Sequence, residues 1–168
     1  MNKGVLVLGL GNPLMSDDGA GLAALECIRR DFEFGRNVEL EDGGTLGLSL
    51  LPIVEDCAAL LVLDAVRFGR LAGTVACLDL NDIPMYLALK TSPHQTGFRE
   101  TLALARMRGT LPAQLCVVGV EVETVEFGAP MSVKVRSALP LMIEGAITRL
   151  VEWGIPCRSI TAELRRSK

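Results

Sequence analysis

The sequence has little histidine and no excess of positive charge. Its 168 residues include a single histidine, His94, and carry a formal net charge of −3 with an isoelectric point near 5.2. Binding of nucleic acid depends on a strong positive field, which this composition does not supply, so we expect no nucleic-acid partner. The basic residues near the C-terminal end are expected to lie in a solvated, flexible tail over residues 155–168: Arg158, Arg165, Arg166 and Lys168.

Cysteine motifs and long apolar runs are also missing. The five cysteines form no C-x-x-C pair, and most lie in apolar stretches, so we expect reduced core residues of a cytoplasmic protein. They are Cys27, Cys57, Cys77, Cys116 and Cys157. No stretch reaches the roughly 20 apolar residues that span a bilayer. Residues 1–15 are typical of a buried first strand rather than a secretion signal, because "GNP" interrupts the apolar run and no small-residue cleavage site follows.

Common catalytic motifs of hydrolases are absent as well. The chain has neither the G-x-S-x-G motif of serine hydrolases nor the H-E-x-x-H motif of zinc proteases. Ser92 precedes His94 with only Pro93 between them, which is unfavourable for a serine–histidine pair. A cysteine–histidine arrangement stays open, although no cysteine lies near a predicted strand end or helix N-terminus.

What the sequence does contain indicates one well-buried domain over residues 1–168. Apolar residues make up 49% of the chain and charged residues 22%, and a chain of this length buries about 70% of its unfolded surface. Short apolar runs typical of strands buried on both faces occur at residues 4–10, 59–66 and 114–122. A further strand is expected at residues 37–42.

Patterns of helical period alternate with these strands, at residues 19–32, 45–57 and 97–109. A final helix is expected over residues 132–153, with Pro140 either kinking it or delaying its start. The run at residues 73–80 follows the preceding strand too closely for a parallel crossover, so that strand should be antiparallel or lie at an edge. The alternation predicts an α/β fold: a three-layer α/β/α sandwich around an open, mostly parallel five-stranded sheet.

Carboxylates follow three of the predicted strands. Asp17 and Asp18 come after the first strand, Asp42 ends the second and Asp64 ends the third. Ligands of open α/β sheets bind beyond the carboxyl ends of the strands, which is where these acids should gather. Ordinary roles are open for most of them, since Asp17 and Asp18 suit a helix N-terminus and Asp42 suits a turn before two glycines. Asp64 follows an apolar run, where an unpartnered charge is costly to bury.

His94 lies between a proline and a glycine, where a helix is not expected, so we place it on a loop. Carboxylates about 4 Å apart repel each other by about 4 kcal/mol at an effective dielectric constant of 20. A shared cation removes that repulsion, and one imidazole with two carboxylates suits zinc, nickel or cobalt. A satisfied loop histidine is the alternative. Two neighbours at a helix start point about 100° apart, so only one of Asp17 and Asp18 should face such a site.

The glycine-rich segment after the first strand allows two other interpretations. Gly9 and Gly11 match the first two glycines of a dinucleotide-binding motif, but Leu14 takes the third place and two acids follow. The same "GLGNP" is similar to the opening of peptidyl-tRNA hydrolases, which have a related α/β fold. Those enzymes carry a histidine soon afterwards and a basic face for tRNA, and neither is present here.

Four motifs together have a more specific match. They are "GLGNPLMSDDGAG" (residues 9–21), "DGGT" (42–45), "LDAV" (63–66) and "SPHQTGF" (92–98), with "VVGVEVE" (117–123) behind them. In this order, over about residues 4–153, the chain resembles the NiFe-hydrogenase maturation endopeptidases, which have a phosphorylase/hydrolase-like fold. The resemblance implies a cytoplasmic protease that removes a C-terminal extension from the precursor of the hydrogenase large subunit once nickel has been loaded.

The resemblance also implies residue roles. The metal-contacting residues carry over to Asp18, Asp64 and His94. Substitution of Asp64 or His94 is then expected to abolish processing, and Asp17→Asn to be mild. Residues expected to shape the substrate groove are Asp42, Gly43, Gly44 and Thr45.

No permanently bound cofactor is expected, because nickel arrives with the substrate, although cadmium or zinc is expected to occupy the site in vitro. The metal would then polarise the scissile carbonyl or lower the pKa of a bound water, and the sequence leaves that choice open. A non-catalytic nickel chaperone with the same ligands is the alternative.

Overall fold

The computed structural model describes residues 4–88 and 93–160, and the side chains of residues 4–88 and 97–160. Its centre is a five-stranded sheet in the order β3-β1-β4-β6-β5. The parallel strands are β1 (Val5–Leu10), β3 (Val38–Gly44), β4 (Ala59–Val66) and β6 (Gln114–Glu121). The predicted α/β fold with one antiparallel strand is therefore confirmed.

The antiparallel strand is β5 (Val75–Asp79), which pairs with β6 at one edge of the sheet. Both the antiparallel direction and the edge position were expected from the short connection after β4. Residues 67–74 are too few to form a crossover and return the chain in parallel.

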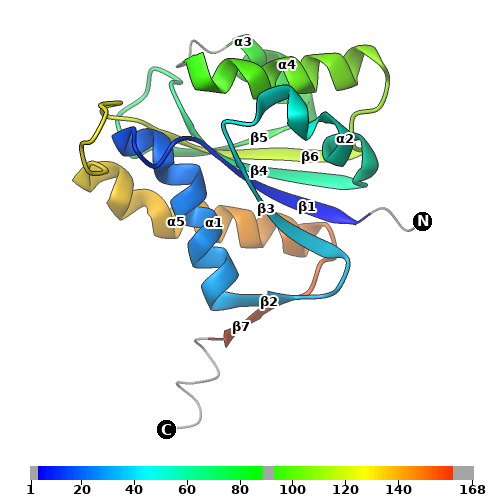
Figure 1. Cartoon of the computed structure of the whole chain (residues 1–168). Coiled ribbons are helices and arrows are strands. Elements are labelled where there is room, and N and C mark those ends of the chain that lie inside the picture. Colours follow the sequence, from blue (N-terminus) through cyan, green and yellow to red (C-terminus); the bar gives the residue numbers. More distant parts are fainter. Residues whose placement is uncertain (1–3, 89–92, 161–168) are drawn as a thin grey trace, which may run out of the picture.

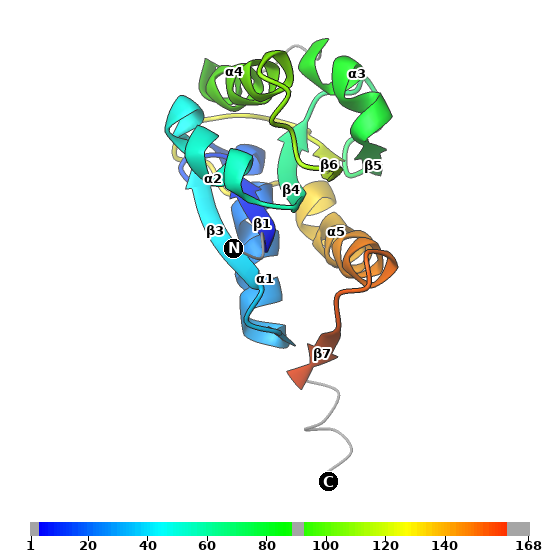
Figure 2. The same ribbon diagram turned by 90° about the vertical axis from the view of Figure 1, so that its right-hand side faces the viewer.

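Helices cover both faces of the sheet (Figures 1 and 2). Helices α1 (Ala20–Asp31) and α5 (Val133–Glu152) lie on one face. The other face carries α2 (Leu51–Asp56), α3 (Ile83–Ala88) and α4 (Pro93–Met107). Three short 3₁₀ turns precede helices: η1 (Ser16–Gly19), η2 (Gly47–Leu50) and η3 (Leu80–Asp82). The three-layer arrangement follows, and α3 is the helix that the sequence pattern did not predict.

The core consists of two apolar layers, one on each side of the sheet. Alternate residues of a strand point to opposite faces, so Val7 packs under α1 and α5 while Leu6 and Leu8 pack under α2 and α4. In β4, Leu61 and Leu63 contribute to the first layer, and Leu60 and Val62 to the second. Each fully buried side chain of this kind contributes about 1.5–3 kcal/mol.

Helix α5 begins and ends where the sequence predicts. Ser132 is its N-cap, accepting a hydrogen bond from the backbone N–H of Val135, and Trp153 is its C-cap. Pro140 lies inside the helix, so the suggestion that it delays the start was wrong. The cap fixes the first turn, and burial of Ala138 and Met142 on either side of the proline offsets the backbone hydrogen bond that it removes.

A small second sheet corrects the expected C-terminal tail. Strand β7 (Cys157–Ser159) pairs antiparallel with β2 (Phe32–Phe34), so this part of residues 155–168 is ordered. Phe34 and Cys157 pack against the first core layer, and Arg158 forms an ion pair with Glu33. The tail prediction failed here because Cys157 packs against the core although the surrounding stretch is polar. Residues 161–168 lie outside the described part.

All five cysteines have free thiols, but not all belong to the core. Cys57 and Cys116 are buried, Cys27 and Cys157 are half-buried, and Cys77 is exposed because it lies on the edge strand β5. A hydrogen bond from the Cys116 thiol lowers the pKa of Cys77 to about 7. The positive charge of Arg149 also lowers this pKa, whereas partial burial raises it. The same contact raises the pKa of Cys116.

No helix in the described ranges is long and apolar enough to cross a membrane.

Alkylation should single out Cys77. Because its pKa is lowered to about 7, the rate with iodoacetamide should be half-maximal near that pH. In Cys116→Val the hydrogen bond is lost, and the midpoint should rise toward the ordinary thiol value of about 8.5. Peptide mapping of the alkylated protein over a pH series measures both midpoints. Equal midpoints in the wild type and the variant would contradict the contact between the two thiols.

Candidate functional site

Buried carboxylates lie at the edge of the sheet where the parallel strands end. Asp17 and Asp18 are in η1, directly after β1, and Asp64 is in β4. Their side chains are 0, 1 and 0% exposed, respectively, which is unusual for aspartate. These three acids are therefore buried near this edge, whereas Asp42 is exposed at the end of β3.

The loop between β1 and η1 is wound tightly around the backbone of Asp18. Oδ2 of Asp18 accepts a hydrogen bond from the backbone N–H of Asn12 at 2.9 Å. Gly11 has φ +117°, and a Cβ there would lie 1.8 Å from the carbonyl oxygen of Asp18. Packing therefore explains this glycine of the "GLGNP" segment, without a dinucleotide.

A second close approach places Asp18 beside the strand of Asp64. A Cβ on Gly21, at the start of α1, would lie 2.3 Å from the carbonyl oxygen of Leu63. The first turn of α1 thus packs directly against the end of β4, and β4 also contacts η1. Of the two acids predicted to contact a metal, Asp64 lies in β4 and Asp18 lies in η1, which follows the neighbouring strand β1.

Asp64 faces the layer that contains α3 and α4, on the same side of β4 as Leu60 and Val62. Its Oδ2 accepts a hydrogen bond from the hydroxyl of Tyr86 at 2.8 Å. Burial raises the pKa of Tyr86 well above its usual value, and the charge of Asp64 adds to this, so the hydroxyl stays protonated and donates.

Tyr86 also contacts Arg99 of α4, through the face of its ring. The guanidinium carbon of Arg99 is 5.2 Å from the centre of the Tyr86 ring, a cation–π contact. Burial lowers the pKa of Arg99, while Tyr86 and Asp64 oppose that shift. The sequence reasoning missed both residues. The signals were present: Tyr86 is the only tyrosine of the chain, and Arg99 directly follows the "SPHQTGF" segment.

His94 lies in a helix, which corrects the loop prediction. Helix α4 begins at Pro93, so His94 is in its first turn. Proline is favoured at the first helical position, because a backbone N–H there has no acceptor within the helix and because the fixed φ of proline suits the helix. The side chain of His94 lies outside the described part. Its role as a metal ligand stays a prediction.

Helix α4 is held against the segment that follows β3. A Cβ on Gly97 would lie 2.8 Å from the Cα of Gly47, so the two backbones touch. The hydroxyl of Thr101 donates to the carbonyl oxygens of Gly47 and Gly97 at 2.9 and 3.0 Å. This contact brings the "DGGT" and "SPHQTGF" segments of the sequence together at one edge.

Within the "DGGT" segment, Gly43 is buried against Leu8, while Asp42 and Thr45 are exposed and Gly44 is half-buried with φ +41°. These residues border the edge that carries the acids. Their assignment to the substrate groove stays a prediction.

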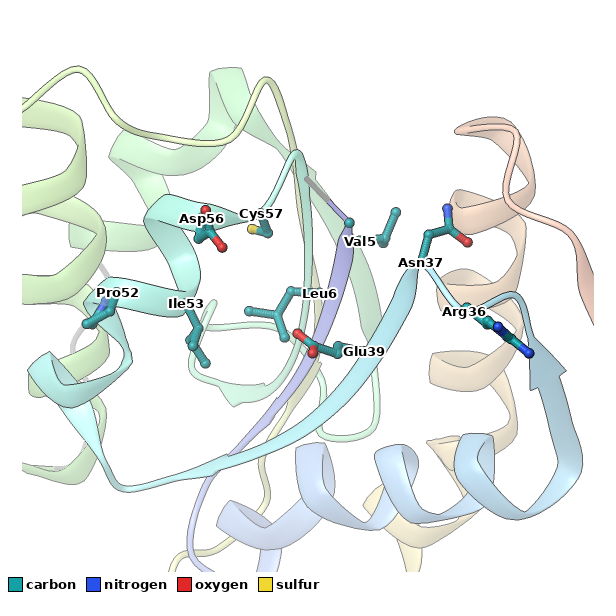
Figure 3. A pocket seen from close by; sticks show the side chains of 10 residues that line it. Val5, Leu6, Arg36, Asn37, Glu39, Pro52, Ile53, Asp56 and Cys57 are labelled. Atoms are coloured by element: carbon teal, nitrogen blue, oxygen red, sulfur yellow. The ribbon is translucent and has the colours of Figure 1, made fainter. Parts of the chain in front are cut away.

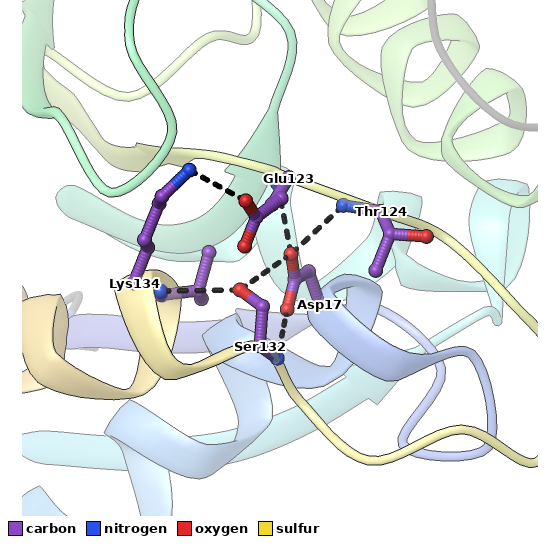
Figure 4. A network of polar contacts seen from close by, with 6 residues as sticks. Asp17, Glu123, Thr124, Ser132 and Lys134 are labelled. Atoms are coloured by element: carbon purple, nitrogen blue, oxygen red, sulfur yellow. Dashed lines mark hydrogen bonds and ion pairs between the residues drawn. The ribbon is translucent and has the colours of Figure 1, made fainter.

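Asp17 has a structural role (Figure 4). Its Oδ2 accepts hydrogen bonds from the backbone N–H groups of Glu123 and Thr124 and from the Ser132 hydroxyl, at 2.8–3.0 Å. Its Oδ1 accepts from the backbone N–H of Ser132 at 2.7 Å. Asp17 therefore ties the segment after β6 to the N-cap of α5, so we expect its substitution to lower stability, while the expectation of a mild effect on processing stays a prediction.

The predicted metal site consists of two carboxylates and a histidine, and it stays a prediction. Among the side chains of residues 4–88 and 97–160, no three His, Cys, Asp or Glu residues are grouped as a metal site. Asp18 and Asp64 supply hard oxygen donors from neighbouring elements, and an imidazole from α4 would complete a set that suits nickel or zinc.

Large apolar side chains surround the same edge. Leu14 lies after β1, Leu46 and Leu48 lie after β3, and Phe127 lies after β6, with exposed fractions between 49 and 78%. The backbone N–H of Gly128 donates to the carbonyl oxygen of Leu14 at 2.9 Å, which holds the first and last of these segments together.

A cavity of about 440 Å³ lies at the opposite end of the strands (Figure 3). Its lining includes Val5, Arg36, Glu39 and Asp56, near the amino ends of β1 and β3. Strand β1 is six residues long, so its two ends lie about 16 Å apart at the rise of a strand. The cavity is therefore not part of the candidate site.

The chain is similar to hydrogenase maturation proteins over most of its length. A family model described as hydrogenase maturation protease matches residues 23–149. The hydrogenase expression/formation protein HupD of Thiocapsa roseopersicina is 40% identical over 156 residues, 92% of this chain and 71% of that protein. The hydrogenase 2 maturation protease of Escherichia coli is 32% identical over 152 residues, 90% of this chain and 93% of that protein.

A solved structure has the same fold over almost all of the chain. The hydrogenase maturating endopeptidase HybD from E. coli superposes with a TM-score of 0.88 at 29% identity, covering 95% of this chain and 99% of that one. These similarities favour a peptidase over the peptidyl-tRNA hydrolase alternative.

Asp17→Asn should destabilise the protein. The amide places N–H donors where a carboxylate oxygen accepted several hydrogen bonds, at a loss of about 3 kcal/mol in the free energy of unfolding. For a chain of this size the melting temperature should fall by roughly 6–12 °C. Calorimetry measures the change, with Glu41→Gln as a control in which an exposed acid of β3 is altered. A melting temperature equal to that of the control would exclude the structural role.

Proposed function

Because the chain belongs to the hydrogenase maturation protease family, we propose that it is the endopeptidase that removes the C-terminal extension of the NiFe-hydrogenase large-subunit precursor after nickel insertion. The proposal concerns the substrate and the timing of cleavage. The family and the peptidase activity follow from the matched model and from relatives over 90% of the chain or more.

The observation that carries the proposal is the pair of buried carboxylates at the carboxyl edge of the sheet. Asp18 and Asp64 lie on adjacent elements and are almost completely removed from solvent. Burying two acids on neighbouring elements is unfavourable through desolvation, and repulsion adds to this where they approach; a divalent cation relieves both. With the imidazole of His94, they form a donor set suited to nickel.

In this proposal the nickel belongs to the substrate and not to the peptidase. A precursor without nickel then lacks the group that these carboxylates engage, so the insertion of nickel becomes the condition for cleavage. Asp18, Asp64 and His94 position the precursor relative to the scissile bond.

The apolar rim of the site is suited to the precursor itself. Leu14, Leu46, Leu48 and Phe127 come from separate loops around the acidic edge and are exposed in the free peptidase. Apolar side chains gathered at an edge indicate a surface that a partner covers. In this proposal the partner at this edge is the precursor, which carries the nickel. The apolar rim is therefore proposed to bind the precursor next to its cleavage site.

Processing of a defined substrate tests the function. The purified chain is incubated with nickel-loaded precursor and, separately, with nickel-free precursor, and release of the C-terminal peptide is followed by mass spectrometry. Cleavage of the loaded form alone is expected. An intact loaded precursor would exclude the peptidase, and a chaperone would instead transfer nickel without releasing a peptide.

Asp64→Asn and His94→Ala should lower processing at least about 100-fold, since each removes one contact to the metal of the substrate. Both variants should keep the fold. In Asp64→Asn the asparagine can still accept the hydrogen bond from Tyr86. Circular dichroism checks the fold, and Glu100→Gln, an exposed acid of the same helix as His94, should process normally. Full activity in both site variants would remove these residues from the site.

Phe127→Ala should raise KM for the precursor about 10-fold with little change in kcat, since burial of a phenyl ring contributes about 1.5–3 kcal/mol to binding. Met107→Ala is the control, an exposed apolar side chain at the far end of α4. A similar KM in both variants would show that the rim does not bind the precursor.

A further inference from the structure

Arg99 has an environment that packing does not explain. The side chain is only 9% exposed, and its Nε and Nη2 are buried without a hydrogen-bond acceptor among the described residues. A buried donor without a partner lowers stability, and a buried charge does so more strongly. The burial of Arg99 is thus unfavourable by itself.

The contact that Arg99 does make is with Tyr86. The guanidinium carbon lies 5.2 Å from the centre of the ring, and the hydroxyl of that ring donates to Oδ2 of Asp64 at 2.8 Å. Tyr86 is itself 1% exposed. The three side chains form a continuous series from α4 through α3 to β4.

The orientation of an aspartate carboxylate is soft by itself, since its terminal torsion is broad and roughly two-fold. A hydrogen bond to one oxygen fixes that torsion, and metal-binding carboxylates in proteins are commonly held in this way by a second layer of residues. The Tyr86 hydroxyl supplies such a bond, and the stacked guanidinium restricts the ring that carries the hydroxyl.

We propose that Tyr86 and Arg99 are positioning residues that hold the carboxylate of Asp64 in the orientation that engages the metal. Arg99 lies five residues after His94 in α4, so the same contacts couple the helix of one predicted ligand to the strand of another. The inference rests on the proposed function, since it assumes a metal at Asp64.

A positioning role predicts a combination of effects that a structural role does not. In Arg99→Met a buried cation, two of whose nitrogens lack an acceptor among the described residues, is replaced by an apolar side chain, so the melting temperature should stay the same or rise. The affinity for Cd²⁺, used as a metal probe, should nevertheless fall about 10-fold, as for other second-layer substitutions. In Tyr86→Phe the ring stays and the hydroxyl is lost, and Cd²⁺ affinity should fall about 10-fold or more.

Calorimetric titration with Cd²⁺, thermal unfolding and processing of the nickel-loaded precursor are measured together. Matched controls lie near the other end of α4: Arg108→Met, which removes a half-exposed arginine paired with Glu55, and Thr110→Val, which removes a hydroxyl bonded to the same acid. Both should keep the Cd²⁺ affinity of the wild type. Arg99→Lys, which keeps the charge without the planar stack, should recover only part of the affinity.

The outcomes separate this inference from the proposed function. Wild-type Cd²⁺ affinity and processing in Tyr86→Phe and Arg99→Met would overturn the positioning role and leave the peptidase intact. A fall in melting temperature of Arg99→Met with unchanged Cd²⁺ affinity would show a purely structural role. A wild-type chain that binds no Cd²⁺ would overturn the metal site and the positioning role together, whether or not it cleaves the precursor.

Discussion

The burial of negative charge at the carboxyl edge of the sheet is the constraint on which the rest of the site depends. Three aspartates are withdrawn from water there, and each needs a different partner. Asp17 is surrounded by N–H and O–H donors, Asp18 accepts a backbone N–H, and Asp64 accepts a tyrosine hydroxyl. The first arrangement fixes the fold, while the other two orient carboxylates that the proposed function assigns to a metal.

Glycine makes this arrangement possible. The loop after β1 can wrap around Asp18 because Gly11 has no side chain, and α1 can press against β4 because Gly21 has none. Both positions bring a backbone within van der Waals distance of a carbonyl oxygen, where any Cβ would collide. The glycine-rich sequence that resembles a nucleotide-binding loop is therefore explained by close packing around an acid.

The sequence predicts the fold well because strand and helix periods are local signals. The continuous apolar run of β4 ends in an acid; the structure confirms the buried strand, and the functional role of Asp64 stays a prediction. The predictions were wrong where the position of a residue in the fold outweighs the local sequence pattern. Pro93 was interpreted as a helix breaker, although at the first position of α4 it favours the helix. The stretch around Cys157 was taken for a tail because its anchoring to Phe34 is remote in sequence.

The candidate site was predicted less completely, for a similar reason. Asp18 and Asp64 stand at strand ends, where position alone suggests function. Tyr86 and Arg99 lie inside α3 and α4, and only the fold brings Tyr86 into contact with Asp64 and with Arg99. The distinction between Asp17 and Asp18 likewise depends on the β6–α5 connection, more than 100 residues further along the chain.

The backbone contact between Gly47 and Gly97 has an evolutionary consequence. Two chain segments that touch without intervening side chains have a separation set by main-chain atoms, so amino-acid replacement at these positions cannot adjust it gradually. A change in binding specificity would therefore fall to the side chains of the surrounding loops, while the separation between the β3 turn and α4 stays fixed.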